Sequence, residues 1–298
     1  MIDLRGGMAL TLHADGVGTK ILVAQAMRKY DTVGIDCVAM TVNDLICLGS
    51  EPVALLDYLA LEREDDELVK EIMKGLATGA KEASAPIVGG ETAILGEMIE
   101  GRGGNGFDLA SMGVGIVKKR EVIDGSAIRA GDMVIGLRSS GLHSNGYTLA
   151  RKVLTRKHSL NEFLPSLGKT LGEELMLPTK IYVRPVLELL RRLEVHGLAN
   201  ITGGAFSKLA RLTRTKSLAF RLNPLDRLPV FDMIANEGRL SAKEMYTTFN
   251  MGVGFCIVLA PSSAEEAIRL CKKEGFDASV IGKIAKGRGV YLGKGLLA

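Results

Sequence analysis

The chain has no tryptophan, only 8 prolines and only 4 cysteines among its 298 residues. The cysteines form no C-x-x-C pair, so their spacing indicates neither a zinc ribbon nor a redox motif. The sequence opens without a secretory signal, and we therefore expect reduced thiols in a cytoplasmic protein. No run of about 20 apolar residues occurs, so we expect no membrane span. The cysteines are Cys37, Cys47, Cys256 and Cys271.

The chain also lacks a large excess of charge of either sign. Lys plus Arg number 38 and Asp plus Glu 34, which gives a net charge of +4. No long basic run appears, so a nucleic-acid partner is not expected, whereas mild basicity suits a protein that handles small anions. Hydrophobic residues make up 47% and charged residues 24%, values that are ordinary for a globular protein.

The length is too great for one ordinary core and predicts two domains. A polar, turn-rich stretch at 119–132 marks the division, which we place between residues 1–125 and 126–298. Strands and helices alternate irregularly in both halves, which favours an α+β fold. The expected helices are 19–30, 34–48, 65–84, 146–154, 162–175, 180–193, 205–214 and 262–274. The expected strands are 8–13, 53–61, 107–118, 133–138, 218–222, 250–259 and two within 279–292.

The first candidate site is Asp15-Gly16-Val17-Gly18-Thr19-Lys20, at a strand-to-helix junction. Glycine lets a backbone approach a ligand closely, and free N–H groups at a helix start favour a phosphate. Asp15 is a candidate metal ligand. The order G-T-K differs from the G-K-[ST] of a P-loop, so this is not that motif. The alternative is a turn with a capping aspartate.

The second candidate site is Asp36, Asn43 and Asp44, within a mostly apolar helix. At about 100° per residue, Asp36 and Asn43 lie about 20° apart on that helix. Burial of such groups is costly without a partner, and a hard cation such as Mg²⁺ prefers carboxylate oxygens. The alternative is that Asp36 caps the helix and the others face solvent. Asp57, inside an apolar strand, is a further metal or substrate contact or a hydrogen-bonded core residue.

The third candidate site is Gly89-Gly90-Glu91-Thr92, directly after a short apolar strand. A carboxylate at a strand end beside flexible backbone is often a working group, although a plain turn explains the pattern equally well. The glycine-rich loop at 95–106 contains G-x-G-x-x-G. A strand rather than a helix follows it, so we predict a closing lid and no dinucleotide site.

Two further loops are rich in hydrogen-bond donors. Residues 139–146, SSGLHSNG, link a strand to a helix and suit an anion, with His143 as donor or proton carrier. A structural histidine is the alternative. Residues 196–205, HGLANITGGA, precede a helix that carries Lys208, Arg211 and Arg214. That arrangement suits a sugar phosphate, and a solvated basic face is the alternative.

Taken together, these segments resemble the aminoimidazole ribonucleotide synthetase family, whose members are also called phosphoribosylformylglycinamidine cyclo-ligases. The matching blocks run in family order through nearly the whole chain. They are DGVGTK (15–20), DTVGIDCVAMTVNDL (31–45), EPVALLDY (51–58), VGGETA (88–93), FDLASMGVGIV (107–117), SSGLHSNGY (139–147), PTKIYVRPVLELL (178–190), NITGGA (200–205) and EMYTTFNMGVGF (244–255).

The resemblance implies a homodimer of two α+β domains. Residues 1–125 would bind ATP and metal, and their sheets would pair across the dimer into a barrel. Residues 126–298, an α/β sandwich, would bind the phosphorylated substrate. ATP, with Mg²⁺, would phosphorylate the formyl oxygen of formylglycinamidine ribonucleotide, and ring closure to aminoimidazole ribonucleotide would release ADP and phosphate.

The resemblance also implies roles for single residues. Asp44, Glu91 and His143 would be catalytic, and Asp15, Asp44 and Glu91 would hold the metal. The ATP contacts would be Asp15, Gly16, Gly18, Thr19, Lys20, Asp36, Asn43, Gly89 and Gly90. The substrate contacts would be Ser140, His143, Ser144, Asn145, Thr202, Gly203 and Gly204.

The chain departs from the family pattern at Ala14, Lys180, Asn200 and Ala205, where a hydroxyl residue, Arg, His and Gly are common. Family members also carry a few dozen residues before the first block, so either such a segment precedes Met1 or the ATP site is built differently. Two other functions stay open. One is a sibling enzyme such as a thiamine-monophosphate kinase, a selenide dikinase or a hydrogenase-maturation dehydratase. The other is a non-catalytic nucleotide-binding subunit.

Overall fold

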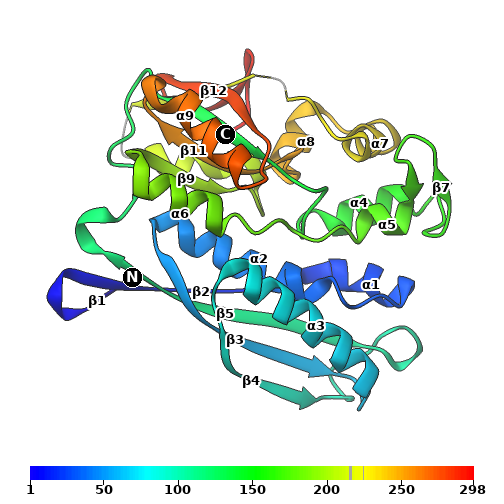
Figure 1. Ribbon diagram of the computed structural model, residues 1–298. Coiled ribbons are helices and arrows are strands. Elements are labelled where there is room, and N and C mark those ends of the chain that lie inside the picture. The colour runs from blue at the N-terminus through cyan, green and yellow to red at the C-terminus, as the bar shows by residue number, and fades with distance from the viewer. Residues whose placement is uncertain (215–216, 224) are drawn as a thin grey trace.

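Two β-sheets stacked one above the other form the molecule, with helices between and around them (Figure 1). The computed structural model describes residues 1–214, 217–223 and 225–298. A five-stranded sheet has the order β1-β2-β5-β3-β4, and a seven-stranded sheet has the order β14-β13-β10-β12-β6-β11-β9. The two sheets come from the two ends of the chain, as expected of an α+β fold with an N-terminal and a C-terminal part.

The N-terminal sheet is antiparallel except for its last pair, β3 and β4, which are parallel. Helix α3 connects that pair, so a single β-α-β crossover lies inside an otherwise antiparallel sheet. The strands are β1 (Ile2–Asp3), β2 (Met8–Gly16), β3 (Glu51–Leu61), β4 (Ile87–Ile94) and β5 (Phe107–Lys118), and the helices are α1 (Ile21–Met27), α2 (Val33–Leu45) and α3 (Asp66–Ala83).

The C-terminal sheet is mixed, with β10 and β13 parallel and its other described pairs antiparallel. Its strands are β6 (Met133–Arg138), β9 (Val195–Asn200), β10 (Leu218–Leu222), β11 (Val253–Leu259), β12 (Ala278–Lys286), β13 (Gly289–Leu292) and β14 (Gly295–Leu296). The helices are α4 (Tyr147–Leu154), α5 (Leu171–Leu175), α6 (Val183–Arg192), α7 (Pro229–Gly238), α8 (Ala242–Thr248) and α9 (Ala264–Lys273).

Helix α9 packs against β6 and β12 and against α6. The 3-10 helix η6 (Ala205–Thr213) packs against β9, β10 and β13, and α8 packs on it. β5 ends at Lys118 and β6 begins at Met133, so the predicted division between 125 and 126 falls in the segment that connects the two sheets. Among the described residues, we find no helix with the length and apolar character needed to cross a lipid bilayer.

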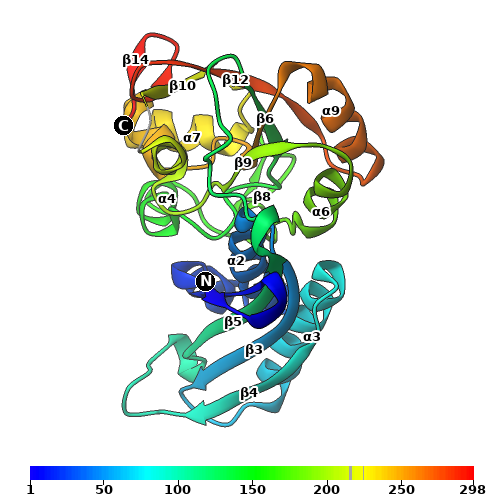
Figure 2. The same cartoon turned by 90° about the vertical axis from the view of Figure 1, so that its left-hand side faces the viewer.

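Helix α3 forms because its sequence is amphipathic and well capped. The Asp65 side chain accepts the N–H of Leu68 at 3.0 Å, as a helix N-cap does. Leu68, Ile72 and Leu76 recur every four residues and are buried, which gives the helix one apolar side. That side packs against α2, which lies between the N-terminal sheet and the C-terminal part (Figure 2).

The helices cover only one face of the N-terminal sheet. Residues of β2 alternate, with Ala9 and Thr11 buried toward α2 and Leu12 on the opposite face at 47% exposure. In the neighbouring strands, the residues that pair with this second face also have small or apolar side chains. Two of its rows are Leu12–Val114–Ala54 and Ala14–Met112–Leu56–Gly89. Within the described part of the chain, no helix packs on that face.

The predicted elements need correction in several places. The helix predicted over 162–175 is only Leu171–Leu175, because a short hairpin, β7 (Phe163–Leu164) and β8 (Lys169–Thr170), precedes it. Helices α7 and α8 lie in a stretch for which no element was predicted. The segment at 89–92 is not a turn after a strand but the middle of β4.

Candidate functional site

Helix α2 links the two parts of the molecule through its polar side chains. The side-chain oxygen of Asn43 accepts the N–H of Tyr182 at 2.8 Å, and its Nδ2 donates to the carbonyl of Lys180 at 2.8 Å. Both partners belong to the segment that leads into α6, which lies in the C-terminal part. The amide predicted as an ATP contact is therefore fully buried in a domain-to-domain connection.

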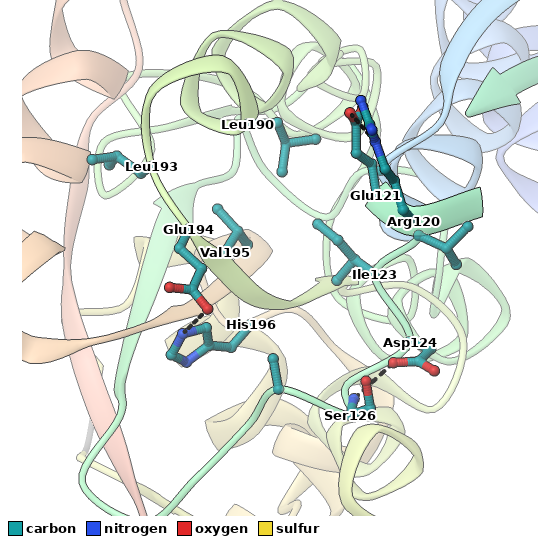
Figure 3. Close-up of a pocket in the computed structure, with 13 residues that line it drawn as sticks. Arg120, Glu121, Ile123, Asp124, Ser126, Leu190, Leu193, Glu194, Val195 and His196 are labelled. Carbon is teal, nitrogen blue, oxygen red and sulfur yellow. Dashed lines mark hydrogen bonds and ion pairs between the residues drawn. The ribbon is translucent and has the colours of Figure 1, made fainter. Parts of the chain in front are cut away.

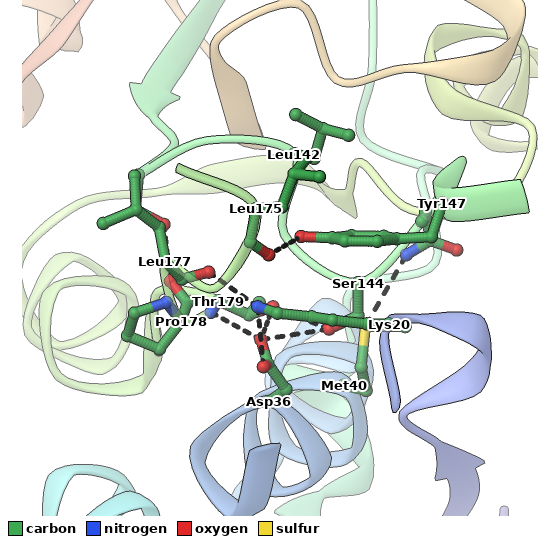
Figure 4. A network of polar contacts seen from close by, with 12 residues as sticks. Lys20, Asp36, Met40, Leu142, Ser144, Tyr147, Leu175, Leu177, Pro178 and Thr179 are labelled. Carbon is green, nitrogen blue, oxygen red and sulfur yellow. Dashed lines mark hydrogen bonds and ion pairs between the residues drawn. The ribbon is translucent and has the colours of Figure 1, made fainter. Parts of the chain in front are cut away.

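Lys20 and Asp36 form a second connection, drawn in Figure 4. Lys20 Nζ lies 2.7 Å from Asp36 Oδ2, and both side chains are 0% exposed. Lys20 also donates to the carbonyl of Leu177, and Asp36 Oδ1 accepts the Thr179 N–H at 2.7 Å and the Ser144 hydroxyl at 3.1 Å. Burial lowers the pKa of Lys20, and the carboxylate of Asp36 partly offsets that effect. These two predicted ATP contacts bond one another and the C-terminal part.

The turn at 139–146 is held in an unusual shape. His143 has a φ of 66°, in the left-handed region, and its Nε2 accepts the N–H of Ser140 at 3.3 Å. A Cβ on Gly254 would come within 2.4 Å of the imidazole, so only glycine fits there. Asn250 donates to the carbonyls of Gly141 and of residue 142 at 2.9 and 3.1 Å. The turn is thus fixed on several sides.

His143 is a neutral group in this setting. Its side chain is buried, and burial together with the positive charges of Lys20 and Lys180 lowers the pKa of His143 to about 3. A histidine that resists protonation and lies away from solvent shapes the turn through its hydrogen bond. The predicted role in proton transfer stays a prediction.

Strand β2 and two loops of the C-terminal part meet at the C-terminal end of α2. Asp44 Oδ1 accepts the Nδ2 of Asn200 at 2.7 Å, and His13 Nε2 lies 3.2 Å from Asp44 Oδ2. One turn earlier on α2, Met40 contacts the Nδ2 of Asn145 at 3.6 Å. A Cβ on Gly203 would lie 3.5 Å from the Asn145 side chain, so the turn at 139–146 and the loop at 200–204 are neighbours.

Basic side chains border the loop at 200–204. Residues 205–213 form a 3-10 helix, in which every third side chain lies on the same side. Lys208 and Arg211 follow that spacing, and Lys208 Nζ donates to the hydroxyl of Thr202. Ala205 has a φ of 41°, a backbone conformation that favours glycine. The third glycine that is common in the family at this position therefore has a structural reason.

A row of polar residues crosses the N-terminal sheet beneath α2. The register pairs Asp15 with Ser111, Ser111 with Asp57 and Asp57 with Gly90. The Ser111 hydroxyl bonds Thr41 on α2 at 2.6 Å, so the row faces that helix. Burial raises the pKa of Asp57, and a Cβ on Gly90 would lie 2.6 Å from the Asp57 carboxylate. Gly90 thus leaves room for this carboxylate.

Glu91 lies apart from the other predicted metal ligands. It follows Gly90 in β4, so its side chain points to the opposite face of the sheet from Asp57, and it is exposed. Among the described residues, no group of three or more His, Cys, Asp or Glu side chains is arranged to hold a metal ion. By contrast, Asp15 faces α2, and Asp44 belongs to that helix.

A separate hollow lies on the connection between the two sheets (Figure 3). It encloses about 410 Å³ and is bordered by residues 120–127 and by 190–196. His196, buried at its edge, has its Nδ1 2.7 Å from Asp132 Oδ2. None of the residues predicted to bind ATP, metal or substrate lines this hollow.

Comparison with known families decides the affiliation of the chain. Residues 1–117 match the family described as AIR synthase related protein, N-terminal domain, and residues 129–294 match the corresponding C-terminal domain. The chain belongs to the AIR synthase family. A curated relative from Methanocaldococcus jannaschii, named phosphoribosylformylglycinamidine cyclo-ligase, is 50% identical over 94% of this chain and 79% of its own length. A relative of the same name from Pyrococcus furiosus is 47% identical over 96% and 82%.

Solved structures share the AIR synthase fold at low identity. A thiamine-monophosphate kinase from Stenotrophomonas maltophilia superimposes with a TM-score of 0.72 at 19% identity, over 99% of this chain and 88% of its own. The hydrogenase maturation protein HypE, in a complex with ATP, superimposes with a TM-score of 0.66 at 19% identity, over 96% and 79%. At such identity the likeness concerns the fold alone.

The sequence pattern of the AIR synthase family did not point to every residue of this site. His13 stands just before the first block and Asn250 inside the last, and neither was among the predicted site residues. A polar residue in an otherwise apolar strand was the available signal for His13. For Asn250 the signal was an amide between the apolar residues Phe249 and Met251.

Proposed function

We propose that this chain carries out its reaction between its two domains, where the end of α2 meets the loops at 139–146 and 200–204. The chain is an ATP-dependent phosphoribosylformylglycinamidine cyclo-ligase, which closes the imidazole ring of aminoimidazole ribonucleotide in purine biosynthesis. The observation that carries this conclusion is the near-complete match to curated cyclo-ligases. The contacts of α2, from the N-terminal domain, with two predicted loops of the C-terminal domain support the location of the site.

The chemistry explains why ATP is needed. The formyl carbon of formylglycinamidine ribonucleotide is part of an amide, which is a poor electrophile with a poor leaving group. Transfer of the γ-phosphoryl group of ATP to the formyl oxygen turns that oxygen into a leaving group. The amidine nitrogen then attacks the formyl carbon, the C–O bond breaks, and inorganic phosphate departs with ADP already formed. Catalysis of such a transfer rests mainly on positioning and charge stabilisation.

The backbone of the first loop is suited to the nucleotide. Gly16, Gly18 and Thr19 precede α1, where free N–H groups and small side chains allow a phosphate to approach. In this proposal Lys20, Asp36 and Asn43 support the same site indirectly. Their side chains are buried in bonds to one another and to the segment at 177–182, and so they fix the loop without reaching solvent.

The second half of the site holds the phosphorylated substrate. Thr202, Gly203 and Gly204 form a loop bordered by Lys208, whose ammonium group bonds Thr202. A ribose phosphate bound there would have its charge balanced by this lysine. The side chains of Asn145 and Ser144 come from the facing turn, and Ser140 bonds the carbonyl of residue 178 at its base.

Mg²⁺ would be held by one or two carboxylates together with phosphate oxygens of ATP, because this ion seldom binds in an all-protein cage. The carboxylates of Asp15 and Asp57 fit, since they flank Ser111 in one row, and no described basic side chain forms an ion pair with either. Bound Mg²⁺ would neutralise the charge that develops on the transferred phosphoryl group. Asp44, already held by two side chains, and Glu91, on the other face of the sheet, would act on the site indirectly.

The uncovered face of the N-terminal sheet supports a homodimer. Apolar side chains such as Leu12 and Tyr58 stand 47% and 43% exposed there. An apolar sheet face without a covering layer is unfavourable in water and marks an interaction surface. Two copies joined through this face would bury it and close the paired sheets into a barrel. A role in purine biosynthesis also suits the cytoplasmic location that we propose.

Substrate choice separates this function from its alternatives. The purified chain would be mixed with ATP and Mg²⁺, and ADP release would be followed with formylglycinamidine ribonucleotide or with thiamine monophosphate. We expect release only with the former, at a rate that saturates with substrate. Release with thiamine monophosphate would assign the chain to a sibling activity. Nucleotide binding without turnover on either compound would indicate a non-catalytic subunit.

A further inference from the structure

Side chains of both domains approach the carboxylate of Asp44, one as an ion-pair partner when its imidazole is protonated and one as a hydrogen-bond donor. His13, from β2 in the N-terminal sheet, has its Nε2 3.2 Å from Asp44 Oδ2. Asn200, at the end of β9 in the C-terminal sheet, donates its Nδ2 to Asp44 Oδ1 at 2.7 Å. The Asp44 side chain is 23% exposed and that of His13 33%, whereas the whole Asn200 residue is 4% exposed. Asp44 therefore lies between side chains of the two sheets.

Both partners of Asp44 stand at the start of a proposed binding loop. His13 lies two residues before Asp15 in the same strand, so the two side chains share a face of the sheet. Asn200 lies two residues before Thr202, where the proposed substrate-phosphate loop begins. Movement of either partner relative to Asp44 would thus shift one loop relative to the other.

The three residues sit on rigid supports. Asp44 lies in the last turn of α2, whose residues are almost all buried. His13 is paired with Gly113 of the central strand β5, and Asn200 with Phe255 of β11. Regular elements on both sides make a side-chain bridge effective as a spacer, because the backbone cannot easily adjust to its loss.

We propose that His13, Asp44 and Asn200 form a positioning bridge that sets the separation between the nucleotide loop and the substrate-phosphate loop. This inference rests on the function proposed above. In-line phosphoryl transfer depends strongly on the distance between the two reactants, and small displacements slow the chemical step without greatly weakening either ligand's binding. His13 and Asn200 act through Asp44 and are positioning residues.

The test replaces each end of the bridge and measures kcat, KM and ADP binding separately. In His13→Ala and Asn200→Ala we expect kcat to fall on the order of 10- to 100-fold, as for other groups that orient a reacting site. The Kd for ADP, measured by calorimetry without substrate, should change less than about threefold, because each binding loop remains intact. His13→Gln keeps a nitrogen donor within reach of Asp44 and should retain most of the activity.

The matched control is His158→Ala. This histidine also contacts carboxylates, Glu162 at 3.0 Å and Glu237 at 2.9 Å, but it belongs to none of the proposed loops. We expect its kcat to equal that of the wild type. His13 and Asn200 act on the same carboxylate. The kcat of the double variant should therefore be no lower than that of the less active single variant. Asn200→His, which keeps a donor toward Asp44, provides a second active variant if the alanine variant fails to fold.

Several outcomes would overturn the proposal. An unchanged kcat in folded His13→Ala and Asn200→Ala would remove any positioning role. A fall in kcat for His13→Gln as large as that for His13→Ala would show that the imidazole itself is required. A loss of ADP affinity equal to the loss of kcat would indicate ligand binding instead of positioning. A wild-type chain without turnover would contradict the proposed function, and this result is distinct from all three.

Discussion

At the scale of single residues, a buried ion pair links the two domains. Lys20 and Asp36 are 0% exposed and 2.7 Å apart. A buried ion pair contributes little more to the free energy of unfolding than an apolar pair of the same shape. Removal of one partner, however, leaves the other charge buried and unpaired. This asymmetry governs how substitutions of the pair should behave.

We therefore expect Lys20→Met to lower the free energy of unfolding by about 3–5 kcal/mol. The double variant Lys20→Met with Asp36→Leu should regain part of this loss, because no charge remains unpaired. Urea unfolding followed by circular dichroism measures both values. Lys118→Met is the control, since its pair with Glu121 is half exposed and should contribute less than about 1 kcal/mol. Equal losses for Lys20→Met and Lys118→Met would contradict this interpretation of the buried pair.

His143 provides a pH-dependent test at the same scale. The pKa of His143 is lowered from 6.5 to about 3 in the folded chain. Between these two pH values, His143 is protonated in the unfolded chain and neutral in the folded chain. Stability should therefore decrease as pH falls from about 6.5 toward about 3, by about 1.4 kcal/mol per pH unit from this group. His143→Asn tolerates the left-handed backbone and lacks the titrating group. We expect the difference in unfolding free energy between the two proteins to follow this slope, and a difference independent of pH would contradict it.

These residues show what the sequence can and cannot reveal. The apolar surroundings of Asp36 and Asn43 correctly predicted that each needs a partner. The partners, Lys20 and the backbone near Tyr182, come from distant parts of the chain, and local spacing cannot supply them. The prediction therefore named an ion where the structure provides a lysine and peptide groups. The proposed roles of these residues toward ATP remain untested.

At the scale of elements, α2 and α3 approach each other through glycines. A Cβ on Gly34 would lie 2.2 Å from the backbone nitrogen of Leu76, and a Cβ on Gly75 would lie 2.6 Å from the carbonyl of Asp31. Contacts this short cannot be relieved by rotating a side chain, because the opposing atoms belong to the backbone.

Gly34→Ala should consequently force the two helices apart and lower the free energy of unfolding by about 1–3 kcal/mol or more. Gly295→Ala is the matched control, since its φ is not positive and its nearest neighbour would lie 3.5 Å from the new Cβ. Thermal unfolding of both variants measures the effect. A melting temperature for Gly34→Ala equal to that of Gly295→Ala would rule out the close helix contact.

The elements also show where pattern reasoning succeeded. The long amphipathic helix at 66–83 and the alternating strand at 107–118 were predicted, because burial on one side leaves a clear period in the sequence. The short helix at 242–248 was missed, although Ser241 and Glu244 form a capping box that could have revealed it. Residues 89–92 were placed after the end of a strand because glycines usually interrupt strands, but here β4 continues and Gly90 makes room for Asp57.

At the scale of the whole molecule, membership in the AIR synthase family was predicted from ordered motifs and is confirmed by the comparisons. The contacts that join the two domains were less accessible to prediction. Asp44, Asn145 and Asn200 are far apart in the sequence and meet only because α2 lies between the sheets. The predicted division between domains and the predicted barrel remain proposals.

The proposed dimer gives a test at this scale. Leu12→Glu places a charge on the uncovered sheet face and should prevent association, because a charge is costly to bury in an apolar interface. Sedimentation equilibrium should give twice the 31.9 kDa chain mass for the wild type and a single chain mass for the variant. Met98→Glu, at a 79% exposed position in the glycine-rich loop, should leave the mass unchanged. A monomeric wild type would contradict the dimer.

We propose that the chain closes its substrate's ring by placing the γ-phosphoryl group of ATP on the formyl oxygen. The most direct test uses formylglycinamidine ribonucleotide labelled with a heavy isotope at that oxygen and follows the label by mass spectrometry during turnover. We predict that the label appears in inorganic phosphate, in a one-to-one ratio with aminoimidazole ribonucleotide and ADP. Release of the label as water, with unlabelled phosphate, would contradict the account.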